Sequence, residues 1–301
     1  MRRALRRLAG ERGEAGLFQL LLAMSMSLAV LGATLSIFSG AEQDNVAANK
    51  RTDSDEIARS TLDVIARQLR DLASPTIEQP DAVDQAGPYD IVFETVDPVG
   101  PNSADNVSNV ERVRYCLGGT DDAGVLYRQE QTWTTATPPG VPSTSACPSS
   151  VPAWSSTAQV TTGIVNRIGG QDRPLFTYDA SDPSDITLVH AQLYVDTDPL
   201  HPPGETWLST GVYLRNQNRR PSASFTADTA VPGKIVLNGS TSEDPEGEPL
   251  EYDWYDGATQ IGSGVRFDYA APSGTTHTIT LKVFDPAGLE GDSVPQQVTI
   301  S

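Results

Sequence analysis

Hydrophobic and polar positions follow three successive patterns along the chain. Residues 15–38 carry no charge, residues 41–74 repeat apolar positions every few residues, and the remainder alternates apolar and polar residues over short runs. The first run, of roughly 24 residues, would form a helix about 36 Å long, which is enough to cross the hydrocarbon core of a bilayer. It is also longer than the apolar region of a secretory signal peptide.

The second pattern predicts that the helix continues beyond the membrane. Its apolar positions lie mostly on one helical face, and they are Val46, Ile57, Leu62, Ile65, Leu69 and Leu72. The opposite face is charged, and Pro75 ends the pattern after Ser74. We therefore expect one helix over 17–74, with a transmembrane part over 17–40 and an amphipathic part over 41–74.

The third pattern predicts an antiparallel sheet within residues 75–217, because alternating runs separated by turn-forming residues are typical of half-buried strands. The predicted strands are 89–97, 110–119, 124–133, 186–196 and 205–217. Residues 134–156 are rich in Pro, Ser and Thr and predict a long loop. With the amphipathic helix packed on this sheet, the first part of the chain has an α+β fold.

A polar segment over 216–221, ending in Pro, predicts a short linker to a second domain. Beyond it, strand candidates recur at regular spacing over 223–227, 234–238, 251–255, 265–269, 277–284 and 296–300. Such spacing predicts an all-β sandwich over 218–301.

Charge changes the picture in two ways. The chain has 39 acidic and 21 basic residues, a net charge of −18, which excludes nucleic acid as a partner. Five arginines lie in the first 12 residues, before the apolar run. Basic residues on the short flank of a membrane helix stay inside, so we expect a single-pass protein with a cytoplasmic N-terminus and its bulk outside.

The chain contains two cysteines, Cys116 and Cys147, both after the predicted membrane helix. In an oxidising compartment they predict one disulfide that ties the long loop to the strand holding Cys116. The histidines His190, His201 and His277 have no ligand spacing relative to the cysteines, so a zinc site is not expected.

No catalytic motif emerges from the sequence. It has no Gly-x-Ser-x-Gly elbow and no phosphate-binding glycine loop, so we expect neither enzyme activity nor an organic cofactor. Asp244, Glu246 and Glu248 lie two residues apart in a Gly-containing segment. This spacing fits a calcium-binding loop, but a polar turn that needs Asp, Pro and Gly for backbone reasons is the favoured interpretation.

The N-terminus resembles type IV pilins and type II secretion pseudopilins. The basic leader ends in "RGEAG" and is followed by "LFQLLLAM", similar to the family's Gly, then Phe-Thr-Leu-x-Glu-Leu-Leu-x-Ala-Met. The resemblance implies that residues 1–16 are a leader, that a prepilin peptidase cuts after Gly16, and that Leu17 becomes an N-methylated terminus. Gly13 is a second candidate for the cut.

The sequence departs from the family at the fifth mature position. The family usually has Glu there, whereas this chain has Leu21, or Phe18 if the cut follows Gly13. Gln19 is the polar residue nearby and supplies no charge. An N-terminal ammonium group without a carboxylate partner inside the membrane costs free energy. In the family, minor subunits thought to sit at a filament tip also lack this Glu. The departure therefore indicates a minor subunit near the tip.

The C-terminal part is similar to PKD domains, a family of immunoglobulin-like modules. The similarity rests on "VLNGSTSEDPEGEPLEYDWY" (236–255) and "HTITLKVFDPAG" (277–288). It implies that Trp254 is the buried tryptophan between two sheets. After Trp254 the family's usual turn is replaced by "YDGATQIG", which predicts a hairpin around Asp256-Gly257.

Two functions follow from these resemblances. In the first, the protein is a minor pilin or pseudopilin in a cell-surface filament, with other subunits bound through its helix and the PKD-like module displayed toward a surface, a glycan or another protein. In the second, it is a single-pass tethered binding protein that never enters a filament. Cleavage after Gly16 distinguishes the two, because a tethered protein needs no such cut.

Overall fold

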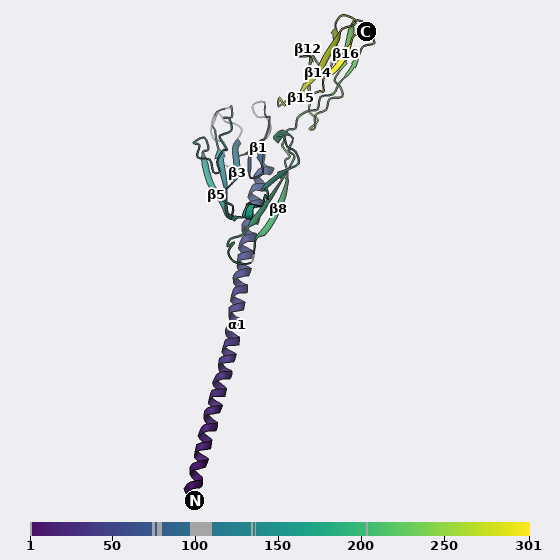
Figure 1. Ribbon diagram of the computed structural model, residues 1–301. Coiled ribbons are helices and arrows are strands. Elements are labelled where there is room, and N and C mark those ends of the chain that lie inside the picture. Colours follow the sequence, from purple (N-terminus) through teal and green to yellow (C-terminus); the bar gives the residue numbers. More distant parts are fainter. Residues whose placement is uncertain are drawn as a thin grey trace.

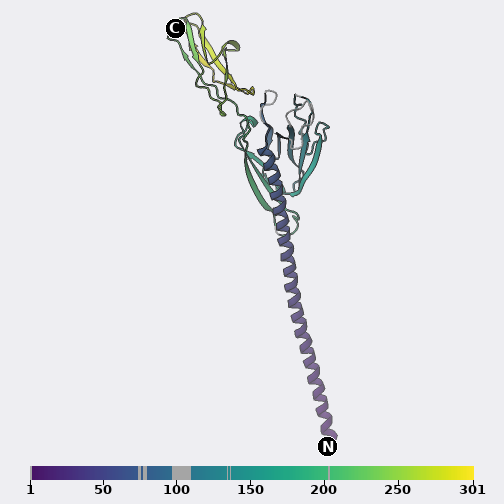
Figure 2. The ribbon, with the colours of Figure 1, turned by 180° about the vertical axis from the view of Figure 1, so that it is seen from behind.

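The computed structural model describes residues 2–73, 76, 80–96, 110–133, 135, 137–202 and 204–301. Within this part it describes the side chains from Gly16 on, except that of Leu17. A long helix leads from the N-terminus into a β-rich domain, and a second β-rich domain lies at the end of the molecule farthest from the N-terminus (Figure 1). The view from behind shows the same order of the three parts (Figure 2).

Helix α1 spans Arg2–Arg70, and its 69 residues give it a length of about 100 Å. All side chains over 18–39 are exposed, including the large apolar ones. Within the segment Phe18–Arg70, this part is long and apolar enough to cross a membrane. The prediction of a long N-terminal apolar helix is confirmed, and the helix also includes residues 2–16.

The helix ends at Arg70, before the predicted end at Ser74, which lies outside the described residues. The reason is that the following residues pair with the neighbouring strand. Leu72 forms a bridge with Thr95, and the Ala73 N–H donates to the carbonyl oxygen of Glu94 at 3.0 Å. The chain therefore leaves the helix as soon as strand partners become available.

Burial of α1 is confined to about the last third of the helix. Lys50 makes a buried ion pair with Asp196 at 2.9 Å, and the helix joins the core of the domain from Ala58 on. The helical members of this core are Ala58, Leu62, Ile65, Ala66 and Leu69. Val46, which the apolar pattern placed on the same face, is exposed, because the sheet does not reach that far toward the N-terminus.

An eight-stranded antiparallel sheet packs against this part of the helix. The strand order is β1-β2-β3-β4-β5-β7-β6, and β8 pairs with β7. The strands are β1 (Val83–Gly87), β2 (Asp90–Val96), β3 (Val110–Thr120), β4 (Ala123–Gln131), β5 (Ser156–Ile164), β6 (Phe176–Tyr178), β7 (Leu188–Val195) and β8 (Thr206–Tyr213). Two short 3₁₀ helices, η1 (Ile168–Gly170) and η2 (Pro183–Asp185), lie in the connections.

The sheet has two parts, joined between β5 and β7 by the single pair Ile164 and Val195. Figure 1 shows β8 on one side of the helix and β3 and β5 on the other, and Figure 2 agrees. Strands of both parts contribute residues to the core that includes the helix. The five strands predicted from alternation are present with bounds shifted by a few residues.

The C-terminal domain is a sandwich of two antiparallel sheets. One has the order β13-β10-β9, and the other has the order β12-β11-β14-β15 with β16 paired to β14. The strands are β9 (Thr226–Asp228), β10 (Lys234–Asn238), β11 (Glu251–Asp256), β12 (Thr259–Ser263), β13 (Arg266–Ala270), β14 (Thr276–Phe284), β15 (Glu290–Asp292) and β16 (Gln296–Thr299).

Trp254 is fully buried between the two sheets, as predicted. Its ring meets Phe225 edge to face at 5.3 Å, and its Nε1–H donates to the Gly264 carbonyl oxygen at 2.8 Å. The predicted hairpin around Asp256-Gly257 is also present, since β11 and β12 pair next to Gly257, which has a positive φ of 60°. Glycine adopts this conformation without strain.

The helix is joined to the sheet by a buried polar contact as well as by the apolar core. The hydroxyl group of Tyr115, on β3, donates to the side-chain oxygen of Gln68 on α1. Burial raises the pKa of Tyr115 to about 12, although the nearby Arg128 charge acts in the opposite direction. The folded state therefore keeps this proton at a pH where the unfolded chain, with a tyrosine pKa of 10.0, has begun to lose it.

This difference predicts a loss of stability in alkali. The stabilisation is fully present below pH 10 and disappears as the pH rises toward 12, by on the order of 2 kcal/mol. Urea unfolding of the full chain in detergent, measured across this range, should show a shallower fall for Tyr115→Phe. The exposed Tyr213→Phe serves as control. An unchanged slope in Tyr115→Phe would contradict the prediction.

Candidate functional site

The residues of the predicted processing site lie within α1. Gly16 is exposed, and no atom lies within 4 Å of the position where a Cβ would be. Gln19 and Leu21 are exposed as well, in a helical stretch without any carboxylate between residues 16 and 38. Gly13 is helical, and neither its surroundings nor the side chain of Leu17 belongs to what the structure describes. Cleavage at Gly16 or Gly13 remains a prediction.

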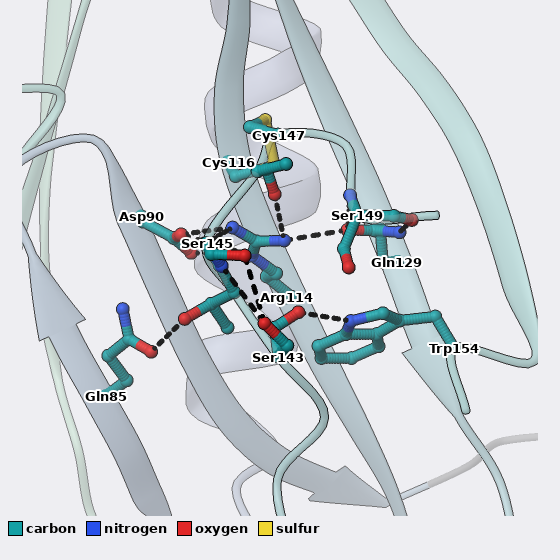
Figure 3. Close-up of polar contacts among 12 residues, drawn as sticks. Gln85, Asp90, Arg114, Cys116, Gln129, Ser143, Ser145, Cys147, Ser149 and Trp154 are labelled. Atoms are coloured by element: carbon teal, nitrogen blue, oxygen red, sulfur yellow. Dashed lines mark hydrogen bonds and ion pairs between the residues drawn. A yellow bond between two sulfur atoms is a disulfide. The ribbon is translucent and has the colours of Figure 1, made fainter. Parts of the chain in front are cut away.

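On the other face of the sheet, away from the helix, β3 carries two buried arginines, Arg112 and Arg114. The alternation of a strand explains their placement, because the next residue after each, Val113 and Tyr115, points into the apolar core with the helix. Figure 3 shows the surroundings of Arg114, with the long loop lying across the strands.

The guanidinium of Arg114 joins the sheet to this loop. It pairs with Asp90 on β2 at 2.5 Å and donates to the side-chain oxygen of Gln129 on β4 at 2.9 Å (Figure 3). It also donates to the carbonyl oxygens of Ala146 and Thr144 in the loop, both at 2.8 Å. All of its nitrogens therefore have partners, which a buried cation requires.

Arg112 makes a similar set of contacts two residues earlier. It pairs with Asp84 at 2.7 Å and with Glu94 at 2.8 Å, and it donates to the carbonyl oxygen of Pro139 in the loop at 2.8 Å. Burial raises the pKa of Asp84, although the charge and hydrogen bond of Arg112 act to lower it. The two arginines thus compensate three carboxylates and supply donors to loop carbonyls.

The predicted disulfide Cys116–Cys147 is present, with 5.9 Å between the two Cα atoms. Gln129 adds a second link beside it, since its side chain bonds to the carbonyl oxygen and the N–H of Ser149, at 2.8 and 2.9 Å (Figure 3). Trp154 Nε1–H donates to the Ser143 carbonyl oxygen at 3.3 Å. We call residues 137–155, held in this way across β2, β3 and β4, the fastened loop.

The arginine contacts were missed in the sequence, although a signal was present. Arg112, Arg114 and Cys116 alternate along one predicted strand and therefore share a face with the half-cystine. Because the guanidinium groups are fully used in structural contacts, this cluster has no free group for chemistry. Among the residues that the structure describes, no set of three His, Cys, Asp or Glu side chains is placed to hold a metal ion.

The acidic segment of the sandwich adopts a polar turn. Asp244 Oδ1 accepts the backbone N–H groups of Glu246 and Glu248, at 2.9 and 3.0 Å. Glu246 pairs with Arg219 at 2.6 Å. Burial and the charges of neighbouring acids raise the pKa of Glu248. Of the two interpretations of this spacing, calcium loop or polar turn, the observed hydrogen bonds favour the turn.

Comparison with solved structures finds PKD domains as structural neighbours. The PKD1 domain of Vibrio anguillarum Epp is 25% identical, with a TM-score of 0.25, over 28% of this chain and 99% of that domain. The PKD1 domain of the Vibrio cholerae metalloprotease PrtV is 19% identical, with a TM-score of 0.24, over 27% of this chain and 98% of that domain. No protein-family model and no curated protein matches the chain.

The buried arginines generate a prediction about stability. Arg114→Met should lower the free energy of unfolding by about 3 to 5 kcal/mol, because Asp90 and two loop carbonyls lose their partner. Arg215→Met, at an exposed position after β8, should change it by less than about 0.5 kcal/mol. Urea unfolding of the full chain in detergent measures both. Equal effects in the two variants would show that the guanidinium is not needed.

Proposed function

We propose that the protein is a minor pilin or pseudopilin, a membrane-inserted subunit that is cut after Gly16 and then added to a type IV pilus-like filament. The observation that carries this proposal is the division of one continuous helix. Its residues 18–39 are apolar and exposed all round, whereas its residues from Ala58 on belong to the core of the β domain. A helix of this kind anchors the domain in lipid and is equally suited to a bundle of helices.

Transfer from membrane to filament requires that both environments cover the same surface. Lipid tails and the side chains of neighbouring helices are similarly apolar, so the exposed leucines and methionines of α1 are satisfied by either. The small residues Gly32 and Ala33 allow close approach of a second helix. The β domain, attached to the same helix, would then lie outside the helical bundle, with the sandwich farther away from the helix start.

The missing carboxylate supports a place at the filament tip. Removal of the leader creates an ammonium group on Leu17, which in a filament lies among apolar helices. A Glu at position 21 would neutralise the ammonium of a neighbouring subunit, and Leu21 provides no charge for this purpose. A subunit without it is suited to the first position, where it does not have to join a preceding subunit.

A second candidate function is a tethered binding protein that stays in the membrane. The observation that favours it is the same Leu21, because a simple membrane anchor needs no carboxylate within the bilayer. In that case the arginine-rich N-terminus is kept, and the sandwich acts as the exposed module. In both proposals the N-terminus is cytoplasmic and both β domains lie outside.

Processing separates the two candidates. We expect protein recovered from membranes of its own host to begin at Leu17 and to be heavier by one methyl group, as shown by intact mass and N-terminal sequencing. Gly16→Leu should abolish the cut, whereas Gly32→Leu, at a glycine farther along the same helix, should leave it intact. A chain that begins at Glu14 would move the cut to Gly13, and one that begins at Met1 would leave the tethered protein.

The tip position is tested by restoring the charge. Leu21→Glu should increase the amount of the protein in sheared filaments several-fold, because the new carboxylate neutralises a neighbouring ammonium. Leu22→Glu places the same charge on the next residue, where it points in another direction, and should not increase incorporation. Equal amounts of Leu21→Glu and unmodified protein in filaments would remove the support for a tip position.

A further inference from the structure

Strands β7 and β8 leave one face of the sheet open. The fastened loop lies over β2, β3 and β4, at the other part of the sheet. Alternate residues of β7 and β8 point into the core, among them Ala191, Leu193 and Val212. The outward positions therefore face each other across the strand pair as Leu188 and Tyr213, His190 and Gly211, Gln192 and Ser209, and Tyr194 and Trp207. We call these outward residues the β7–β8 face.

Two aromatic residues mark the ends of this face. Trp207 is 57% exposed and Tyr213 is 69% exposed. The other three of the chain's four tryptophans, Trp133, Trp154 and Trp254, are buried. The two exposed rings lie six positions apart along β8, which corresponds to about 20 Å. Tryptophan and tyrosine side chains combine a large apolar ring with a polar group, which suits them to contact with ligands that have both apolar and polar groups.

The middle of the β7–β8 face carries small and polar residues. Ser209 and Gly211 are the outward residues of β8 between the two rings. The ring of His190 lies over Gly211, with an atom 3.1 Å from where a Cβ would be, so the space above this glycine is limited by an imidazole. The face is therefore a shallow strip with hydrogen-bonding groups in its centre and an aromatic ring near each end.

The surroundings of Trp207 are held in place by their mutual contacts. Tyr194 lies beside it, with ring centroids 6.3 Å apart and planes inclined by 27°. Arg173 lies over the Tyr194 ring at 4.3 Å and pairs with Glu205 at 2.5 Å. The side-chain amide of Gln192 donates to the Tyr194 hydroxyl at 3.0 Å. Because these polar groups are already fixed beside the Trp207 ring, less conformational entropy is lost when a ligand binds.

These features select the chemical class of ligand. We propose that the β7–β8 face binds an extended neutral polysaccharide, with sugar rings stacked on Trp207 and Tyr213 and hydroxyl groups bonded to the polar strip between them. Pyranose rings present flat C–H faces to aromatic rings and hydroxyl groups at their edges, which matches this alternation of aromatic and polar groups. The Arg173–Glu205 pair is neutral as a whole, and the net charge of −18 repels polyanions.

A protein partner fits this surface less well. The centre of a protein–protein contact is usually an apolar patch, whereas the central outward positions here are Gln192, Ser209 and His190. The proposal does not depend on filament assembly, because the face belongs to the β domain alone. It is therefore tested on the full chain in detergent, and its failure leaves the proposed function unaffected.

The test uses tryptophan fluorescence. The protein is kept in a detergent without a sugar headgroup, because a maltoside would compete, and is titrated with cellohexaose, chitohexaose, laminarihexaose and maltohexaose. Since Trp207 is the exposed tryptophan, a bound glycan should shift its emission to shorter wavelength and protect it from acrylamide quenching. Polygalacturonate, an anionic glycan, should produce neither effect.

Variants assign the binding to the face. In calorimetric titrations, Trp207→Ala and Tyr213→Ala should each weaken binding of the best hexasaccharide by about tenfold or more. Both side chains are exposed, so both variants should fold. Val294→Ala, at an exposed position on the sandwich, should bind as the unmodified protein does. Binding that survives Trp207→Ala, preference for polygalacturonate, or no binding of any of the four neutral hexasaccharides would overturn the proposal.

Self-association is the remaining outcome. If light scattering shows a dimer, and Trp207 becomes protected from acrylamide as protein concentration rises without any glycan, the face is a contact between copies of this chain. That result would also overturn the proposal.

Discussion

The structure depends on how the apolar surface of one helix is covered. Helix α1 changes environment along its length, because the sheet covers it from Ala58 on and nothing in the described chain covers residues 18–39. The two parts of the sheet, joined at Ile164 and Val195, both reach the helix, so its C-terminal end is enclosed from more than one side. The exposed segment 18–39 needs another apolar environment, and lipid or other helices provide one. The same requirement thus shapes the β domain and is the basis of the proposed function.

On the opposite face of the sheet, the carbonyl oxygens of the fastened loop need hydrogen-bond donors, and charged side chains provide them. The fastened loop contains many prolines and no strand among its described residues, so its carbonyl oxygens cannot be satisfied by a neighbouring ladder. Arg112 and Arg114 supply the donors, and the acids beside them balance their charge. The chain has 39 acidic and 21 basic residues. That two of these basic residues are buried beneath the fastened loop indicates that the loop needs them. The disulfide and Gln129 hold the same loop by independent means.

Hydrophobic periodicity in the sequence predicted those elements that have one consistently apolar face. The apolar run, the strands around Phe93 and Tyr115, and the buried Trp254 each follow from one repeated pattern. It did not predict β1 or β5, because their sequences VDQAG and STAQVTTGI contain few large apolar residues. It placed Val46 in the packed face, since a single sequence does not reveal where a sheet ends. The contacts of Arg114 depend on loop residues 30 and 32 positions farther along the chain, which only the fold brings together.

The segment that joins the two domains is more than a spacer, because its side chains are divided among all three parts of the molecule. Asn216 donates to the carbonyl oxygen of Leu72 at 2.9 Å, just after the helix ends, and Gln217 donates to that of Ser184 at 3.0 Å. Asn218 then donates to Asp285 of the sandwich at 2.6 Å. Both Gln217 and Asn218 are buried, so these bonds are shielded from water. The helix end, the sheet and the sandwich therefore meet at one hydrogen-bonded junction, in which three consecutive residues each bond to a different part of the molecule.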